Sequence, residues 1–470
     1  MITLPALGSA PDAARQALDF TRVPSASLPL APAEPDPLCE LSVAIPVHNE
    51  EAGIAATLAA LAAQVDQTGR PLDPRRYEVL VLANNCTDGT VEQARRFAAA
   101  TPALRLHVIE ILLPPPHAHV GAARRLVMDE ACRRLGSLGR QRGVIATTDG
   151  DTLVRPTWVA SNLEEIAHGA DAVGGRILAT PEEIAALDPG TRLYYRRDTA
   201  YRTLRTAYES ILNPDPANAW PRHHHCFGAS LAVTVQAYLA AGGLPVVHCL
   251  EDMAFVRELE RRDARVRRSP AVNVLTSLRC SGRVDVGLSW TLSKWTRAAA
   301  LGEPLLLESP DAIAWEALNR RCLRQLWERK RTSAAVAQAS ASVGMRMRRL
   351  NQFWRAADTA GEFCQSVCED QRRTRTGPWS LPLMEAQVAN TILRRRLAAL
   401  RHNLRAVTII PARKGRAGSV PPGSRFYEGA GHPWTPPRET LREPRRLSTG
   451  SHGREASSEP VAGAHAVLAG

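Results

Sequence analysis

Between residues 41 and 147, short apolar runs alternate with segments of helical period. Such alternation favours a parallel β-sheet wrapped by helices, because helical crossovers join parallel strands. In chain order, the predicted elements are strand 41–45, helix 50–63, strand 77–82, helix 90–99, strand 106–111, helix 121–135 and strand 144–147. Pro46 is expected to end the first strand, and Asn49 to cap the first helix. The pattern predicts the α/β class, with a mostly parallel sheet flanked by helices.

Polar side chains follow three of these strands directly. They are His48-Asn49-Glu50, the run from Asn84 to Asp88, and Asp149-Gly150-Asp151. In open parallel sheets, ligands bind outside the carboxyl ends of the strands. We therefore expect the three clusters to converge on one edge of the sheet.

The strand signals fade near residue 288, where helical patterns begin over 289–301, 310–331, 334–357 and 383–404. The two ends of the chain are rich in small and polar residues and poor in large apolar ones. The expected organisation is a flexible arm at 1–38, an α/β domain at 39–287, a helical addition at 288–411 and a disordered tail at 412–470. The tryptophans of the addition are expected to pack in its core, as large aromatic side chains usually do.

Composition limits the class of protein. The 470 residues contain no run of about 18 apolar residues without charge and no leader-like start, so we expect a soluble, cytoplasmic protein with no transmembrane segment. Nine scattered cysteines argue for reduced thiols, and Cys364 and Cys368 alone complete no metal shell.

The net charge of +12 suits an anionic partner, either a phosphorylated substrate or a membrane surface contacted peripherally. Much of the excess arginine lies after residue 316, in stretches where a solvated helix face is the commoner explanation. Because no aromatic residues are interleaved with these arginines as a stacking platform, no nucleic-acid partner is expected.

The Asp149-Gly150-Asp151 turn is the strongest candidate for chemistry. Two close carboxylates repel each other unless a cation lies between them. A hard cation such as Mg²⁺ or Mn²⁺, which prefers carboxylate, phosphate and water oxygens, would relieve that repulsion. The alternative is an ordinary Asp-Gly turn with solvated carboxylates.

Seven short motifs occur in a fixed order and together resemble the motif series of family 2 inverting glycosyltransferases, which have the GT-A fold. They are Ile45 to Glu51, Asn84 to Thr90, Gly121 to Arg124, Asp149 to Asp151, Gly228 to Ser230, Gly242 to Pro245, and Glu251-Asp252. The likeness covers about residues 41 to 285. It implies a hexosyltransferase-like enzyme that takes a nucleotide-diphosphate sugar as donor, with an unknown acceptor.

The resemblance also implies roles for single residues. Asp149 and Asp151 would hold Mg²⁺ or Mn²⁺ and the diphosphate, Arg124 would meet phosphate, and Asp252 would be the catalytic base. The implied donor-binding residues are Pro46, Val47, Asn49, Glu50, Asn84, Asp88, Arg124, Asp149 and Gly150. Two departures stand out: Asn84 replaces an acidic residue that often contacts the nucleobase, and no histidine lies between His248 and His402 to add a metal ligand.

Several candidate residues also have an ordinary structural interpretation. Arg124 could be a surface arginine, and Asp252 could cap a helix beginning at Met253. The run from His223 to Cys226 suggests zinc, but adjacent side chains diverge, which favours an acceptor-side loop. Arg279 and Arg283 could clamp an anionic acceptor or the diphosphate, or be solvated.

Three other functions compete with glycosyl transfer. A nucleotidyltransferase would need a Gly-rich phosphate loop near residue 48, which the sequence lacks. A glycoside hydrolase would place its carboxylates about 5 to 10 Å apart on either side of a sugar bond, unlike a two-residue turn. A catalytically silent nucleotide-sugar or phosphate-binding module would keep the site without the reaction.

Overall fold

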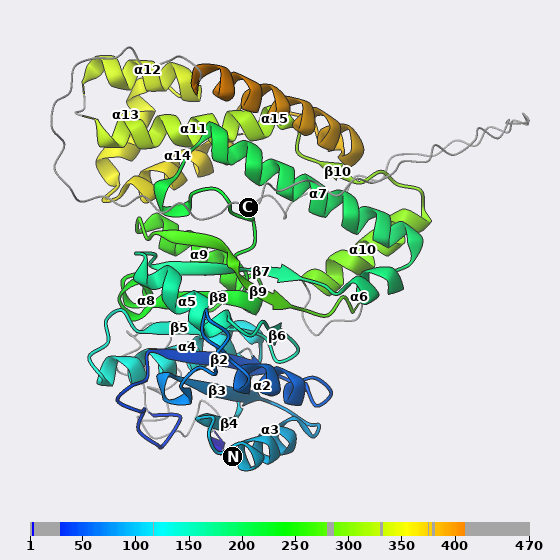
Figure 1. The fold of residues 1–470 in the computed structure, drawn as a ribbon. Coiled ribbons are helices and arrows are strands. Elements are labelled where there is room, and N and C mark those ends of the chain that lie inside the picture. Colours follow the sequence, from blue (N-terminus) through cyan, green and yellow to red (C-terminus); the bar gives the residue numbers. More distant parts are fainter. Residues whose placement is uncertain are drawn as a thin grey trace, which may run out of the picture. The chain divides into compact units, whose positions relative to one another are not determined.

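The computed structural model describes residues 2–3, 29–115, 117–279, 286–329, 332–374, 376–377 and 381–408 (Figure 1). Within them, nine strands form one sheet in the order β1-β4-β3-β2-β5-β8-β7-β9-β6. β8 runs antiparallel to β5 and β7, β6 runs antiparallel to β9, and the remaining pairs are parallel. The strands are β1 (Ile2–Thr3), β2 (Leu41–Val47), β3 (Tyr77–Asn84), β4 (Leu106–Leu112), β5 (Val144–Thr147), β6 (Leu153–Val154), β7 (Ala172–Leu178), β8 (Leu231–Thr234) and β9 (Val266–Leu275). The predicted α/β class with a mostly parallel sheet is confirmed.

Helices cover both faces of the sheet. Leu80 and Leu82 of β3 pack into the apolar core beneath α4 (Val120–Ser137), α8 (Val235–Ala240) and α9 (Glu251–Arg261). Val79 and Val81 pack into the opposite core beneath α2 (Ile54–Ala62), α3 (Thr90–Ala100) and α5 (Trp158–Ala167). Burial on both faces explains why these strands read as continuous apolar runs.

Two local predictions about the first strand and helix are wrong. β2 continues through Pro46 to Val47, because pairing with β5 stops at Ala44 and Pro46 therefore lies where β2 pairs only with β3. A strand tolerates proline where one of its sides is unpaired. Asn49 does not cap α2, whose N-cap is Gly53; Asn49 instead adopts a left-handed φ of 55° in the loop.

The helical addition follows the predicted pattern with two differences. Its elements are α10 (Leu288–Ala300), β10 (Leu306–Leu307), α11 (Pro310–Glu328), α12 (Ser333–Val343), α13 (Met347–Ala356), α14 (Ala360–Arg373), β11 (Met384–Glu385) and α15 (Ala386–Thr408). The helix predicted over 334–357 is divided at Gly344, whose φ of 65° ends α12. Sequence analysis missed α14.

Core packing is confirmed for two tryptophans of the addition. Trp327 and Trp354 stack with ring centroids 5.3 Å apart, and both contact the ring of Phe363. All three belong to the apolar cluster shared by α11, α13 and α14.

A long helix inside the expected α/β domain belongs to the core of the addition. α6 (Pro181–Ala186) leads into α7 (Pro189–Leu212), which lies beside α11 and α15 in Figure 1. Tyr201 and Tyr208 of α7 share an apolar cluster with Ile313 and Leu393. Residues 1–403 form one compact unit.

The start of α14 docks on the end of α9. Asp263 accepts hydrogen bonds from the backbone N–H groups of Ala360 (2.9 Å) and Gly361 (2.6 Å), and Arg261 pairs with Glu362. A Cβ on Gly361 would lie 1.9 Å from the carbonyl oxygen of Glu260, so only glycine permits this approach. The addition therefore braces the helix that begins at Glu251-Asp252.

Most of the expected N-terminal arm and the whole expected tail from residue 412 lie outside the described residues. Within the described part, no helix is both long and apolar enough to cross a membrane.

Candidate functional site

The polar loops at the carboxyl ends of β2 and β3 are tied together by side-chain hydrogen bonds. His48 Nδ1 donates to the carbonyl oxygen of Asn84 at 2.8 Å, which fixes the proton on Nδ1 because a carbonyl can only accept. Thr87 N donates to Asn49 Oδ1 at 2.8 Å, and Thr90 Oγ1 accepts from Glu50 N at 2.7 Å. The first two clusters therefore do converge, as expected from the parallel sheet.

The third cluster, Asp149-Gly150-Asp151, packs against the first. Thr57 of α2 donates to the carbonyl oxygen of Gly150 at 2.9 Å. A Cβ on Gly150 would lie 2.7 Å from Val47 Cγ1 and 3.1 Å from Glu50 Cγ. The glycine is therefore required by this close approach, and Val47 is a buried support of the turn.

Arg124 is not a surface arginine. Its side chain is 4% exposed, and its guanidinium reaches four partners on three segments. They are Asp149 Oδ1 at 2.8 Å, Glu251 Oε1 at 3.0 Å, Thr147 Oγ1 at 2.7 Å and the carbonyl oxygen of Gly228 at 3.3 Å. Burial by itself would lower the pKa of Arg124, but Asp149 and Glu251 outweigh it and raise that pKa. The group stays charged and holds Asp149 in place.

Asp252 lies in the first turn of α9, which begins one residue earlier than Asp252, at Glu251. The N-cap is Leu250, so Asp252 is not the cap residue that the alternative interpretation assumed. Its Oδ2 accepts from Gly228 N at 2.7 Å and its Oδ1 from Met253 N at 2.6 Å. Burial and the neighbouring Glu251 raise the pKa of Asp252, against the effect of the Gly228 N–H.

Arg279 joins two of the clusters. Its Nη2 lies 2.8 Å from Asp151 Oδ2 and 3.1 Å from Glu50 Oε1. Burial and the nearby Asp149 raise the pKa of Asp151 to about 6, although Arg279 opposes this. Arg283 lies outside the described residues.

Five carboxylates gather around two guanidinium groups at this edge: Asp149, Asp151, Glu50, Glu251 and Asp252 around Arg124 and Arg279. This excess of negative charge fits a divalent cation. Among the described residues, no group of three or more His, Cys, Asp or Glu side chains is arranged to hold a metal ion. A cation at Asp149 and Asp151 would take its other ligands from phosphate and water, as Mg²⁺ commonly does.

Some of the residues that were expected to bind the nucleobase already make contacts within the protein. Pro46 is buried in β2, and the carboxylate of Asp88 accepts from Thr90 N and from Glu51 N, each at 3.1 Å. Asn84 is 4% exposed, and its Oδ1 is buried with no hydrogen-bond partner among the described residues. Asn84 is therefore the expected base contact that keeps an unused acceptor.

The run from His223 to Cys226 does not form a metal site. His223 Nε2 lies 3.0 Å from the carbonyl oxygen of Ser269, and Ile177 N donates to His225 Nδ1 at 2.9 Å. Burial lowers the pKa of His223 to about 4 and that of His225 to about 3, so both rings are neutral at pH 7. The loop lies beside the end of β7, past the residues that pair with β8, and leads into the start of β8 at Leu231.

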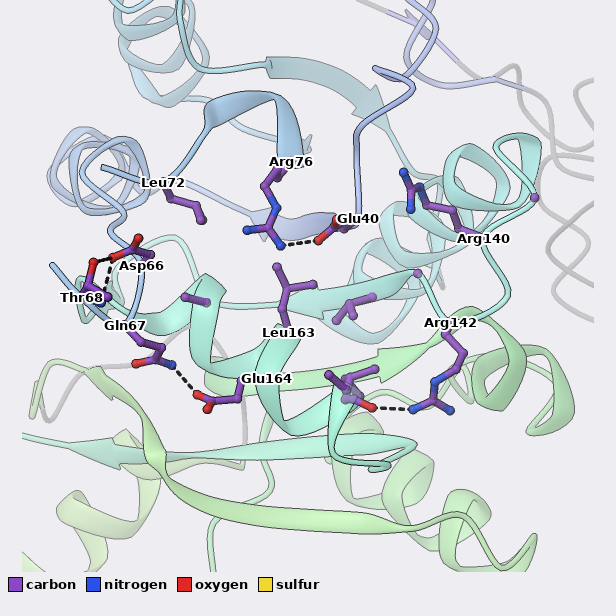
Figure 2. Close-up of a pocket in the computed structure, with 16 residues that line it drawn as sticks. Glu40, Asp66, Gln67, Thr68, Leu72, Arg76, Arg140, Arg142, Leu163 and Glu164 are labelled. Carbon is purple, nitrogen blue, oxygen red and sulfur yellow. Dashed lines mark hydrogen bonds and ion pairs between the residues drawn. The ribbon is translucent and has the colours of Figure 1, made fainter. Parts of the chain in front are cut away.

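A cavity of about 820 Å³ lies at the opposite edge of the sheet, beside the first residue of β5, Val144. Figure 2 shows two pairs of polar side chains along its wall, Arg76 with Glu40 and Gln67 with Glu164. A smaller hollow of about 300 Å³, lined by Leu187, Asp188 and Arg279 among others, lies on the side of the candidate site. The larger cavity is therefore separate from the converging carboxylates.

Sequence reasoning missed three members of the site. Glu251, Thr147 and Gly228 were noticed in motifs or strands, but none was given a role. Glu251 and Thr147 bind Arg124, and Gly228 connects Arg124 to Asp252 through its carbonyl oxygen and its N–H. The Gly-Ala-Ser motif and the Glu-Asp pair were the available signals.

Comparison with known proteins gives a family match for part of the chain. Residues 42–230 match the family described as Glycosyl transferase family 2. The glycosyltransferase AglE of Haloferax volcanii is 31% identical over 138 residues, which are 29% of this chain and 39% of AglE. The match thus spans less than half the length of that relative.

Two solved structures are similar in outline. The mannosyltransferase PcManGT from Pyrobaculum calidifontis, in complex with GDP-Man and Mn²⁺, is 16% identical with a TM-score of 0.37, over 80% of this chain and 89% of its own. TarS 1–349 of S. aureus, in complex with UDP, is 15% identical with a TM-score of 0.37, over 72% and 92%. Through residues 42–230, the chain is similar to glycosyl transferase family 2.

Proposed function

We propose that this protein is a glycosyltransferase that moves a sugar from a nucleotide-diphosphate sugar to an acceptor hydroxyl, with inversion and with a divalent cation. The observation that carries the proposal is the single guanidinium of Arg124, which joins Asp149 of the donor side to Glu251 beside the candidate base. Within a family 2 domain, this connection sets the donor carboxylates and the base at one sheet edge.

Asp252 is the base in this proposal. Its raised pKa makes it a better proton acceptor than an ordinary aspartate. The hydrogen bonds from Gly228 and Met253 fix the direction of its carboxylate. Asp252 takes the proton of the acceptor hydroxyl as that oxygen attacks the sugar carbon, on the face opposite the leaving diphosphate. One displacement of this kind inverts the anomeric centre.

Asp149 and Asp151 have the role of stabilising the leaving diphosphate through a bound cation. A divalent cation held by them, Mg²⁺ or Mn²⁺, would neutralise the negative charge that grows on the diphosphate as the sugar bond breaks. Arg124 does not reach the phosphate directly in this proposal, because four partners already engage its guanidinium. It positions Asp149 instead.

Asn84 is the proposed contact to the nucleobase. Its buried Oδ1 can accept a hydrogen bond but cannot donate one. Each of the common bases presents at least one N–H group on its pairing edge, so the proposed donor is a nucleotide-diphosphate sugar with no base singled out.

The test is a screen of nucleotide sugars for thermal stabilisation, with and without Mn²⁺, followed by transfer assays with the stabilising donor. We expect a shift that needs Mn²⁺ in the wild type and is lost in Asp149→Ala and Asp151→Ala, which should keep the fold because both side chains are partly exposed. Equal stabilisation in these variants would reject the metal assignment. Binding without transfer or donor hydrolysis would indicate a catalytically silent sugar-binding module.

A further inference from the structure

One nitrogen of Arg279 connects two carboxylates from separate loops. Nη2 lies 2.8 Å from Asp151 Oδ2, after β5, and 3.1 Å from Glu50 Oε1, after β2. Arg279 itself follows β9, whose direction is parallel to β7. Three polar loops at the sheet edge therefore meet at a single positive group.

Arg279 relieves a repulsion that the fold imposes. Asp151 has two negative neighbours, Asp149 in the same turn and Glu50, which shares the guanidinium of Arg279. A cation shared by Asp151 and Glu50 offsets this repulsion. The guanidinium neutralises negative charge at Asp151, as a bound divalent cation would. It also contacts Asp151 Oδ2, an oxygen to which such a cation would need to bind.

The attachment of Arg279 leaves its side chain free to change partners. Its side chain is 36% exposed, whereas that of Arg124 is 4% exposed. The backbone next to it is anchored, since Leu278 is buried and its N–H donates to Glu183 Oε1 at 3.4 Å. A long side chain on a fixed backbone can move its charged end by several ångströms without disturbing the fold.

We propose that Arg279 is an internal counter-ion of the Glu50–Asp151 pair, which competes with the divalent cation and turns to the donor's diphosphate when the cation binds. The proposal rests on the proposed function, because it takes Asp151 as a metal ligand. It gives Arg279 two effects of opposite sign. Arg279 weakens cation binding to the protein alone, and it strengthens diphosphate binding once the cation is present.

The experiment measures Mn²⁺ binding to the full chain by the paramagnetic resonance of free Mn²⁺, without any donor. We expect Arg279→Gln to tighten the Mn²⁺ Kd by roughly threefold, the size typical of a partly exposed ion pair. Arg279→Lys keeps a positive charge and should stay near the wild type. Arg348→Gln removes an equally charged, exposed side chain on α13, far along the chain, and controls for net charge.

The second measurement is the affinity for inorganic pyrophosphate at saturating Mn²⁺, by calorimetry. We expect Arg279→Gln to weaken pyrophosphate binding by roughly tenfold, because a charge-assisted contact is lost. Melting temperatures confirm that each variant is folded. An unchanged or weaker Mn²⁺ affinity, or an unchanged pyrophosphate affinity, overturns the proposal.

Asp151→Asn separates this failure from failure of the proposed function. If wild-type protein binds Mn²⁺ and Asp151→Asn does not, the metal site stands, and only the role of Arg279 depends on the Arg279→Gln result. If Asp151→Asn binds Mn²⁺ as the wild type does, the metal assignment in the proposed function is wrong, and the role of Arg279 as a competitor falls with it.

Discussion

Arg124 Nη2 donates to Asp149 Oδ1 at 2.8 Å across 25 positions of the chain. The same guanidinium donates through Nε to Glu251, which is 127 positions away. A buried, planar group with several fixed donors can hold two carboxylates at a set separation, which a lysine cannot. Arg124 therefore holds Asp149 and Glu251 at a set distance from each other.

Replacement of Arg124 by lysine should separate charge from geometry. Arg124→Lys keeps the positive charge but can no longer reach Asp149, Glu251 and Thr147 together, so we expect turnover to fall by about a hundredfold. Steady-state rates at saturating donor and Mn²⁺ would show it. Arg133→Lys on the same helix, where the arginine pairs with Glu130, is the control and should retain activity.

Gly228 offers an independent test of the same connection. In Gly228→Ala the added Cβ would lie 2.7 Å from Arg124 Cζ and 2.8 Å from Nη2, so the guanidinium must shift. We expect lower turnover and a lower melting temperature, since overpacking typically costs about 1–3 kcal/mol. Gly136→Ala in α4 meets nothing within 4 Å and should be neutral or slightly stabilising. Equal behaviour of the two variants would contradict the account of Arg124.

The sequence predicted those parts of the site that depend on local pattern and topology. The strand ending at Thr147 was predicted with the bounds that β5 has, and the parallel order of strands placed the three polar loops at one edge. The carboxylates of Asp149 and Asp151 followed from their position after that strand. These features need only the alternation of apolar runs and helices.

Long-range contacts could not be predicted in the same way. The burial of Arg124 depends on Glu251 and Gly228, which lie more than a hundred positions later in the chain. The role of Asn49 depends on Thr87, whose loop offers partners for its side-chain oxygen and nitrogen alike. The pattern of residues within one segment does not reveal contacts with distant segments. For this reason Arg124 was expected to contact phosphate, and Asn49 to cap a helix.

The stability of the protein in acid should depend on a buried ion pair that lies outside the candidate site. Glu78 and Arg134 are both fully buried and 2.7 Å apart. Burial by itself would raise the pKa of Glu78, but the nearby His107 ring and the hydrogen bonds from Arg134 lower it from 4.5 to about 2. Its stabilisation is therefore complete above pH 4.5 and is lost as the pH falls toward 2.

Urea unfolding of the wild type between pH 5 and pH 3 should show a loss of about 2 kcal/mol from this carboxylate. Glu78→Gln lacks the titrating group, so its unfolding free energy should be lower at pH 7 and should fall less steeply with acid. Parallel pH dependences for the two proteins would show that Glu78 does not ionise with a lowered pKa in the folded state.

The pH dependence of turnover should identify the base. Burial and Glu251 raise the pKa of Asp252 above its usual value of 3.8, and a protonated Asp252 cannot accept a proton. Activity should therefore fall as the pH decreases through this raised pKa, so the acid limb of the kcat/KM profile lies above the usual aspartate pKa of 3.8. Glu251→Gln removes the negative neighbour and should move the acid limb to lower pH. If the acid limb does not move in Glu251→Gln, the group that titrates is not Asp252.

Asp252→Asn distinguishes a base from a structural carboxylate. Asparagine has nearly the same size and keeps one acceptor oxygen, so it can retain the hydrogen bond from Gly228 N or that from Met253 N, but not both. The lost hydrogen bond should lower stability by only about 1 kcal/mol. If Asp252 is the base, turnover should fall by about a hundredfold or more while donor affinity in the presence of Mn²⁺ barely changes, because the donor carboxylates remain in place. If Asp252 only secures the Gly228 loop to α9, turnover should fall no further than the small loss of stability explains. Turnover, donor affinity and melting temperature measured on this variant decide between the two, and wild-type turnover would remove Asp252 from the mechanism.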